Sequence, residues 1–304
     1  NLLKSEDFAA SVDTMVRALT TVTDLESVEE VPTVNKGNRL YHTIGLGAMG
    51  LHTAFALYQI KYGSKESLEF TEAYFLALNY YSLVSSNRIA RERHETFYEF
   101  ADSRYADGSY FSPYVGQDFV FRFPKIAAIF KNMPIPTKED WKVLREKVMK
   151  DGLYHRNRLA VAPNGSISYI NETSASLHPI TQLVENRQEK KVGSIFYPAP
   201  YLSNDTLPFY ETAYNMDQRK IIDVYAVAQK HIDQGMSLTL FMRSQLPEGL
   251  YEWKTKENTM LTTRDLNRLR NYAWRKGIKS LYYVRTYTED DEFNSVNSCE
   301  SCMI

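Results

Sequence analysis

The two cysteines of the sequence have two residues between them and lie within its last six residues. Cys299 and Cys302 form a Cys-x-x-Cys pair, and no histidine lies near them to complete a zinc site. A pair so close to the end of the sequence is a poor candidate for a buried structural role. Two thiols at this spacing can instead form and release a disulfide. We therefore predict a reversible dithiol, with accidental or redox-sensing cysteines as the alternatives.

A turn that contains glycine follows a short apolar run. The run, residues 158–161, predicts a strand, and Pro-Asn-Gly-Ser-Ile-Ser follows at residues 163–168. Gly165 allows backbone N–H groups to converge, and the hydroxyls of Ser166 and Ser168 add donors. Such a group of converging donors, called a nest, suits an anion, especially if a helix begins there. On residue types alone, an ordinary hydrogen-bonded turn remains the favoured alternative.

A tyrosine doublet, Tyr282 and Tyr283, lies on a predicted strand at residues 278–285. A tyrosine can lose an electron and a proton together. However, doublets are expected by chance among 22 tyrosines, and residues 80 and 81 form another one. In isolation, the doublet is better explained by a role in the core.

Residues 45–50, Gly-Leu-Gly-Ala-Met-Gly, match the dinucleotide-binding pattern G-x-G-x-x-G. That site needs a buried strand before the glycines and a second strand after the helix. Residues 39–44 are a poor strand candidate, and the helical pattern continues beyond Glu66 and Glu69. Helix packing through small residues is therefore the preferred interpretation, and a nicotinamide-dependent oxidoreductase is the alternative.

The bulk composition is that of a soluble globular protein. The 304 residues carry a formal net charge of −1, with 43% hydrophobic and 24% charged residues. No long run of one charge indicates a nucleic-acid or membrane-surface partner. The longest stretch without a formal charge, residues 40–60, contains histidines, threonines and glycines, so a buried helix with its preceding turn is expected. No secretory signal is visible, which predicts a cytoplasmic protein.

Hydrophobic periodicity predicts helices that alternate with short strands in the second half of the sequence. Such alternation favours an α/β architecture, with function at strand ends and loops. A polar loop is expected at residues 26–37 and irregular structure at residues 100–136. The predicted helices are residues 6–24, 47–62, 67–94, 141–152, 217–234 and 263–276, and the strands are residues 158–161, 237–242 and 278–285.

Five blocks together resemble ribonucleotide reductase large subunits, most closely the class Ib type. Their order and spacing agree with the family across essentially the whole sequence, although each block alone is a weak signal. The blocks are residues 39–52, 162–179, 231–237 and 279–285, and the terminal cysteine pair.

The resemblance implies the C-terminal portion of a ten-stranded α/β barrel with many helices. Residues 1–287 would form that part of the barrel domain, and residues 288–304 a flexible redox tail. Tyr282 and Tyr283 would transfer a radical, and Cys299 and Cys302 would act as a thiol–disulfide shuttle. The diphosphate of a ribonucleoside diphosphate would be bound by Pro163, Asn164, Gly165, Ser166 and Ile167.

The resemblance also implies the partners of the reaction. A small subunit with a dimetal–tyrosyl centre would deliver the radical, and a thioredoxin- or glutaredoxin-like protein would supply electrons. ATP and deoxynucleotide effectors would bind upstream of this sequence. No cofactor or metal is expected on this chain itself.

The sequence departs from the family in its cysteines. The family uses a thiyl-radical cysteine in an Asn-x-Cys-x-Glu loop and two further active-site cysteines, whereas no cysteine precedes Cys299 here. We therefore expect an N-terminal part of the large subunit to complete the enzyme, and this chain to be inactive alone. The alternative is a non-catalytic dithiol or scaffold protein that retains the fold.

Overall fold

The computed structural model describes residues 7–287, except 27, 29, 190–192 and 256. Two compact units share the chain. The first unit comprises residues 1–47, 69–160 and 231–234, and the second comprises residues 48–68, 161–230 and 235–304. The predicted redox tail, with Cys299 and Cys302, lies outside the described residues.

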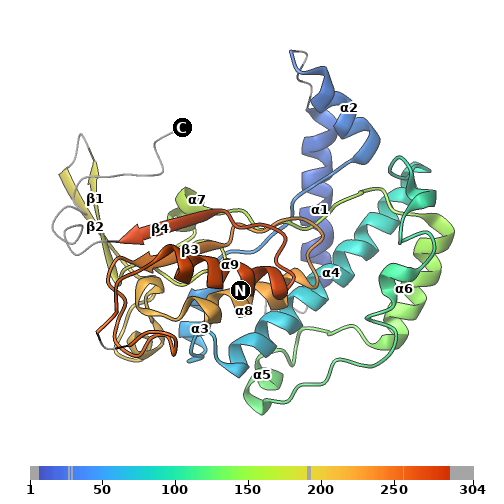
Figure 1. The fold of residues 1–304 in the computed structure, drawn as a ribbon. Helices are drawn as coiled ribbons and strands as arrows, with labels where there is room; N and C mark the ends of the chain where they lie inside the picture. Colours follow the sequence, from blue (N-terminus) through green and yellow to red (C-terminus); the bar gives the residue numbers. More distant parts are fainter. Residues whose placement is uncertain (1–6, 27, 29, 190–192, 256, 288–304) are drawn as a thin grey trace. The chain divides into compact units, whose positions relative to one another are not determined.

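The first unit is helical, and its longest element is α4 (Figure 1). All but the first four residues of α4 belong to this unit. Trp141, Leu144 and Val148 form the buried side of α6 and pack with Leu76 and Phe111 in one apolar cluster. The helices are α1 (Phe8–Leu25), α2 (Pro32–Tyr41), α4 (Lys65–Arg93), α5 (Pro124–Ile129) and α6 (Lys138–Asp151), with 3-10 turns η2 (Phe100–Asp102) and η3 (Ser109–Phe111).

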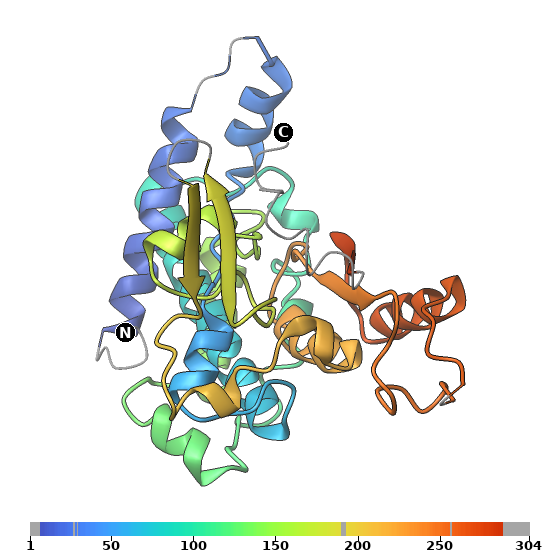
Figure 2. The ribbon, with the colours of Figure 1, turned by 90° about the vertical axis from the view of Figure 1, so that its left-hand side faces the viewer.

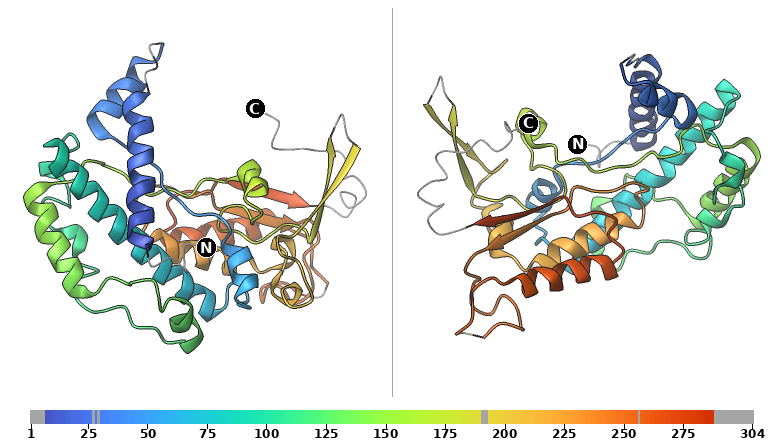
Figure 3. Two further views of the ribbon diagram at one scale, coloured as in Figure 1. Left: turned by 180° about the vertical axis from the view of Figure 1, so that it is seen from behind. Right: turned by 45° about the horizontal axis from the view of Figure 1, so that its top comes forward.

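In its described residues, the second unit combines helices with two small sheets. An antiparallel hairpin, β1 (Val184–Glu189) and β2 (Gly193–Pro198), faces the viewer in Figure 2. The parallel pair, β3 (Thr239–Arg243) and β4 (Tyr283–Tyr287), is joined through α9. Helices α8 and α9 pack against each other, as the right-hand view of Figure 3 shows. The helical elements are α3 (Leu51–Leu57), α7 (Gly165–Ile170), α8 (Gln218–Gln229), α9 (Thr263–Arg275), η4 (Leu207–Phe209) and η5 (Ala213–Asn215).

The α/β architecture is confirmed, and so are the helices predicted at α1, α4, α6 and α9. Helix α6 begins three residues earlier than predicted because Thr137 and Asp140 form a capping box. The predicted helices at residues 47–62 and 217–234 are shorter, and the predicted strand at residues 278–285 begins only at Tyr283. Residues 158–161 form isolated parallel bridges rather than a full strand.

The sequence reasoning missed three features: helix α2, helix α5, which lies within the irregular structure expected at residues 100–136, and the β1–β2 hairpin. The polar loop expected at residues 26–37 contains the start of α2, where Pro32 occupies the first helical position. The β1–β2 hairpin was not predicted, because its first strand, Val-Glu-Asn-Arg-Gln-Glu, lacks the apolar alternation of a half-buried strand. Within the described ranges, no helix combines the length and the apolar character that crossing a membrane requires.

Candidate functional site

The predicted anion-binding turn lies at the end of a parallel bridge in the second unit. Val161 pairs with Met236, and the Ser237 N–H donates to the Val161 carbonyl at 2.9 Å. The chain then turns through Asn164, whose φ of 54° is left-handed, and α7 begins at Gly165. The first N–H groups of a helix have no intrahelical acceptor. A helix does begin at this turn, which is the arrangement that makes a nest of N–H groups more suitable for an anion.

The two serines of the turn differ in their surroundings. Ser166 is exposed, so its hydroxyl can reach a ligand. Ser168 is buried, and its hydroxyl donates to the Gly165 carbonyl at 2.7 Å. The expectation that Ser168 adds a donor for an anion is therefore wrong, because this hydroxyl is used inside the turn.

The start of α3 supports the loop that follows the turn, through reciprocal hydrogen bonds. The Thr53 N–H donates to Ser174 Oγ at 3.1 Å, and the Ser174 N–H donates to Thr53 Oγ1 at 2.9 Å. The Gly50 N–H donates to the Ser174 carbonyl at 2.8 Å. The Thr173 N–H donates back to the Ser168 carbonyl at 3.0 Å, so the loop is joined to α7 as well.

Gly50 is required at its position for two reasons. Its φ of +80° is left-handed, a conformation that L side chains rarely adopt. In addition, a Cβ at this position would overlap the side chain of Thr173. The contact between the start of α3 and the loop after α7 thus depends on a residue without a side chain.

His52 joins α3 to two further segments of the second unit. Its Nδ1 accepts from the Ile180 N–H at 3.0 Å, so Nε2 carries the proton and donates to the Phe209 carbonyl at 3.1 Å. Burial lowers the pKa of His52 to about 4, which keeps the ring neutral in this arrangement.

The G-x-G-x-x-G match has no dinucleotide-binding context. Helix α3 begins only at Leu51, after the last glycine, and the chain continues into α4, which contains both Glu66 and Glu69. No strand follows α3 in the place where the βαβ unit needs one. The expected helix packing through small residues is also wrong, since Gly45 and Gly47 precede the helix.

The tyrosine pair lies at the start of β4. The Tyr282 N–H donates to the Leu238 carbonyl at 2.8 Å, and Tyr283 is the first residue of the strand. The two ring centroids are 4.1 Å apart, and the side chains are 48% and 51% exposed. The neighbouring Tyr283 hydroxyl raises the pKa of Tyr282. A core role, the interpretation favoured for the doublet in isolation, does not fit side chains that are half exposed.

The turn and the tyrosine pair flank the same short backbone segment. Ser237 is hydrogen-bonded to Val161 on one side, and the next residue, Leu238, is hydrogen-bonded to Tyr282 on the other. Neighbouring strands lie about 4.8 Å apart, so Val161 and Tyr282 are separated by about 10 Å. The structure therefore brings together two of the three predicted features, which are 121 residues apart in sequence.

A buried ion pair in the first unit was missed by the sequence reasoning. Arg158 is fully buried, and its guanidinium lies 3.2 Å from the carboxylate of Asp233. That carboxylate also accepts from the backbone N–H groups of Arg158 and Leu159, both at 2.9 Å. The guanidinium further donates to Tyr105 Oη at 3.1 Å and to Asn79 Oδ1 at 3.2 Å. The only signal in the sequence is an arginine within an apolar run.

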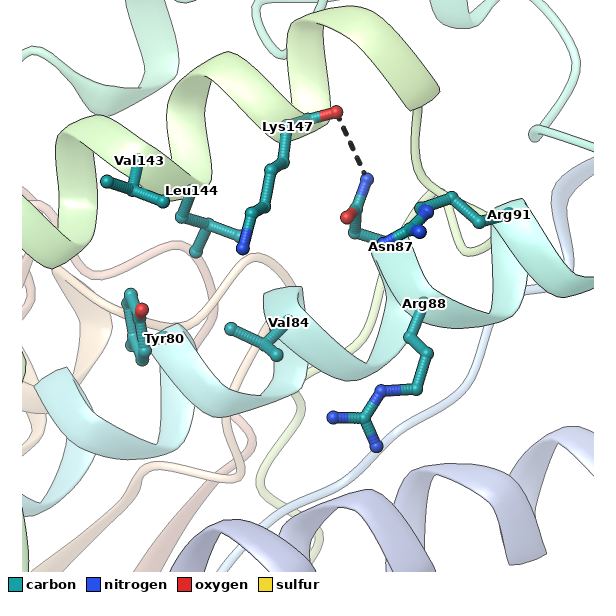
Figure 4. A pocket seen from close by; sticks show the side chains of 8 residues that line it. All are labelled: Tyr80, Val84, Asn87, Arg88, Arg91, Val143, Leu144 and Lys147. Carbon is teal, nitrogen blue, oxygen red and sulfur yellow. Dashed lines mark hydrogen bonds between the residues drawn. The ribbon is translucent and has the colours of Figure 1, made fainter.

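Two pockets are separate from these features. One, of about 170 Å³, lies between α4 and α6 in the first unit; its lining includes Val84 and Arg91 of α4 and Leu144 and Lys147 of α6 (Figure 4). The other, of about 340 Å³, lies in the second unit, at the ends of β3 and β4. Neither contains a predicted site residue. Across the described part of the chain, no group of three or more His, Cys, Asp or Glu side chains could hold a metal ion.

Comparison with known proteins identifies the family. Residues 2–284 match the family model described as ribonucleotide reductase, barrel domain. The chain is 40% identical over 304 residues to the ribonucleoside-diphosphate reductase NrdEB subunit alpha of Bacillus subtilis (strain 168), covering all of this chain and 26% of the relative. It is 39% identical over 304 residues to the ribonucleoside-diphosphate reductase subunit alpha of the same organism, covering all of this chain and 40% of the relative.

A third relative is the ribonucleoside-diphosphate reductase subunit alpha of Mycoplasma pneumoniae, 38% identical over 309 residues, which cover 98% of this chain and 41% of the relative. The chain thus spans less than half the length of each of these relatives. The sheets in the described part are not closed, as expected for a part of a barrel. With nearly its whole length matched, the chain belongs to the ribonucleotide reductase barrel-domain family.

Proposed function

We propose that this chain is the C-terminal part of the alpha subunit of a ribonucleoside-diphosphate reductase. The complete enzyme would reduce ribonucleoside diphosphates to 2′-deoxyribonucleoside diphosphates by a radical mechanism. The observation that carries the proposal is the placement of the anion-binding turn and the tyrosine pair on either side of Ser237 and Leu238. A reductase of this kind needs substrate binding and radical delivery close together.

In this proposal the turn binds the diphosphate of the substrate. The N–H groups of Gly165, Ser166 and Ile167 belong to the first turn of α7, where the helix dipole favours negative charge. Pro163 and Asn164 set the path of the chain into the helix. The start of α3, through Thr53 and Ser174, holds the following loop in place.

Tyr282 and Tyr283 conduct the radical in this proposal. A tyrosine is oxidised by losing one electron and one proton, and a neighbouring tyrosine can then reduce it in the same way. The ring separation of 4.1 Å allows this exchange within the pair. Their half-exposed side chains are open to a small subunit that carries a dimetal–tyrosyl centre.

The dithiol Cys299 and Cys302 supplies the electrons. Removal of the 2′-hydroxyl as water requires two electrons, which two active-site thiols provide as they form a disulfide. The tail dithiol then reduces that disulfide by thiol–disulfide exchange, and a thioredoxin- or glutaredoxin-like protein reduces the tail in turn. We propose that the N-terminal part of the subunit contributes the active-site cysteines and the sites for ATP and deoxynucleotide effectors, and that the enzyme is cytoplasmic.

A direct experiment separates this proposal from a scaffold that retains the fold but has lost the reaction. The variant Cys299→Ser with Cys302→Ser is assembled with the N-terminal part and the small subunit. We expect multiple turnover with thioredoxin to be lost, while one turnover by pre-reduced enzyme survives, as measured by deoxycytidine diphosphate formed per subunit. Unchanged multiple turnover would favour the scaffold, and the single variant Ser301→Ala serves as the matched control.

A further inference from the structure

Tyr114 is stacked on Trp141 in the interior of the first unit. The two ring centroids are 4.2 Å apart, and the ring planes differ by 16°. The side chains are 9% and 1% exposed, and both belong to the apolar cluster around α6. Further parts of a longer subunit can only bury these two rings more deeply. Their contact therefore does not depend on how much of the subunit is present.

The hydrogen bonds around Asn79 have a fixed direction. A guanidinium has donors only, so the atom of Asn79 that lies 3.2 Å from Arg158 Nη2 is the carbonyl oxygen. The Asn79 amide nitrogen then donates to the Tyr114 hydroxyl oxygen at 3.2 Å. Arg158 is itself held by its buried ion pair with Asp233 at 3.2 Å. The ion pair thus determines which atom of Asn79 faces Tyr114.

His231 places a base beside the same hydroxyl. Tyr114 Oη and His231 Nδ1 are 3.3 Å apart, and His231 is 6% exposed. Because the hydroxyl accepts from Asn79, it can donate its own proton to Nδ1, in the imidazole tautomer that carries its proton on Nε2. Burial raises the pKa of the Tyr114 phenol to about 12, so the phenol is neutral. A charge left on this buried ring would be costly, so its oxidation favours release of the proton to His231 together with the electron.

Two neighbouring tyrosines are less suited to oxidation. The Tyr110 hydroxyl donates to Asn79 Oδ1 at 3.0 Å, and an amide oxygen is too weak a base to take up the proton. Tyr105 Oη accepts from Arg158 Nη1 at 3.1 Å, and a cation beside a phenol opposes the removal of an electron from it. Among these three tyrosines, Tyr114 is therefore the one from which an electron and a proton leave most easily.

We propose that Tyr114 and His231 form a redox site that takes up an oxidising equivalent from Trp141. Tyr114 gives one electron to the Trp141 radical cation and, in the same step, its hydroxyl proton to His231 Nδ1. The products are neutral Trp141, a neutral Tyr114 phenoxyl radical and protonated His231. The positive charge moves from one ring to another, so the net charge of the cluster is unchanged. The initial oxidation of Trp141 requires a one-electron oxidant, such as a protein-based radical.

On the proposed function, this site is a second destination for oxidising equivalents, distinct from the pair Tyr282 and Tyr283. A radical that leaves the productive path and reaches Trp141 is passed to Tyr114. The radical is then held in the first unit, which contains neither the tyrosine pair nor the anion-binding turn. This protective role rests on the proposed function, whereas the chemistry of Tyr114 and His231 does not.

Flash photolysis tests the site without any requirement for activity. Trp253→Phe with Trp274→Phe leaves Trp141 as the only one of the three tryptophans in the 304-residue chain. Both replaced residues belong to the second unit. An ultraviolet pulse that tyrosine does not absorb ionises Trp141, and a cobalt(III) ammine complex in solution captures the ejected electron. We expect the absorption of the tryptophan radical to decay while that of a tyrosyl radical grows at the same rate.

Three variants of this tryptophan-reduced chain identify the residues. Tyr114→Phe keeps a ring against Trp141 and should abolish the growth of the tyrosyl signal. His231→Asn keeps a hydrogen-bond acceptor near the position of Nδ1 but is not a base, so transfer should slow at least about 100-fold. Tyr80 is the matched control, because its ring centroid lies 5.0 Å from that of Trp141, while no described residue accepts a hydrogen bond from its hydroxyl. Tyr80→Phe should leave the rate unchanged.

A measurement in deuterium oxide needs no further substitution. Because the proton moves with the electron, transfer should be slower in deuterium oxide than in water, and equal rates would overturn the proposal. So would an unchanged tyrosyl signal in Tyr114→Phe, its loss in Tyr80→Phe, or unchanged transfer in a folded His231→Asn chain. A chain that transfers the radical to Tyr114 but supports no deoxynucleotide formation in the assembled enzyme would contradict only the proposed function.

Discussion

Replacing Tyr283 by phenylalanine is expected to lower deoxynucleotide formation by the assembled enzyme at least about 100-fold. Phenylalanine keeps the ring but has no phenolic proton to release, so it cannot be oxidised by the neighbouring Tyr282. The ring lies 4.1 Å from that of Tyr282 and is half exposed, so loss of the hydroxyl leaves no buried group unpaired. Binding of cytidine diphosphate, measured by equilibrium dialysis, should stay within about two-fold of the unmodified enzyme.

A matched control distinguishes radical transfer from a general effect of losing a phenol. Tyr201 belongs to the same unit, is 58% exposed and lies outside the tyrosine pair. Tyr201→Phe should therefore retain normal turnover in the same assay. If Tyr283→Phe turns over as fast as this control, the tyrosine pair is not on the radical path.

The substitution Asp233→Ala is expected to lower the free energy of unfolding by about 3–5 kcal/mol. Without this carboxylate, the guanidinium of Arg158 remains fully buried beside neutral groups, and two backbone N–H groups lose their acceptor. Removing one partner of a buried ion pair costs far more than removing an exposed one, because the remaining charge cannot reach water. Urea unfolding of the full chain, followed by circular dichroism, measures the loss.

Two further variants serve as comparisons for the stability loss expected in Asp233→Ala. Glu139→Ala removes an exposed ion pair with Lys142 and should cost less than about 1 kcal/mol. Asp233→Asn keeps an acceptor for the backbone N–H groups but removes the charge, so it should fall between the alanine variant and the unmodified chain. An Asp233→Ala chain as stable as Glu139→Ala would mean that the buried pair does not hold this segment in place.

The long, strongly patterned helices could be predicted from the sequence because their signals are local. Helix α9 has a capping box at Thr262 and Asp265 and a regular apolar face, and both can be seen within 15 residues. Helix α2 was missed because Pro32 and the polar residues after it also suit a loop. Strand β1 was missed for a similar reason, since its polar residues do not alternate with apolar ones.

The individual residues of the candidate site were identified by their types, but their arrangement was not. The reciprocal bonds of Thr53 and Ser174 join residues 121 positions apart, and the ion pair of Arg158 and Asp233 spans 75 positions. Such contacts depend on how distant segments pack, which no local pattern specifies. The same holds for Ser168, whose hydroxyl could be assigned to the turn or to a ligand until its partner was known.

The formation of deoxycytidine diphosphate from cytidine diphosphate tests the central claim most directly. The 304-residue chain is assayed with the small subunit, thioredoxin and its reductant, first without and then with the N-terminal part of the subunit. We predict no product without the N-terminal part and repeated turnover with it. Turnover by the chain without the N-terminal part, or no turnover when all parts are present and folded, would contradict the account.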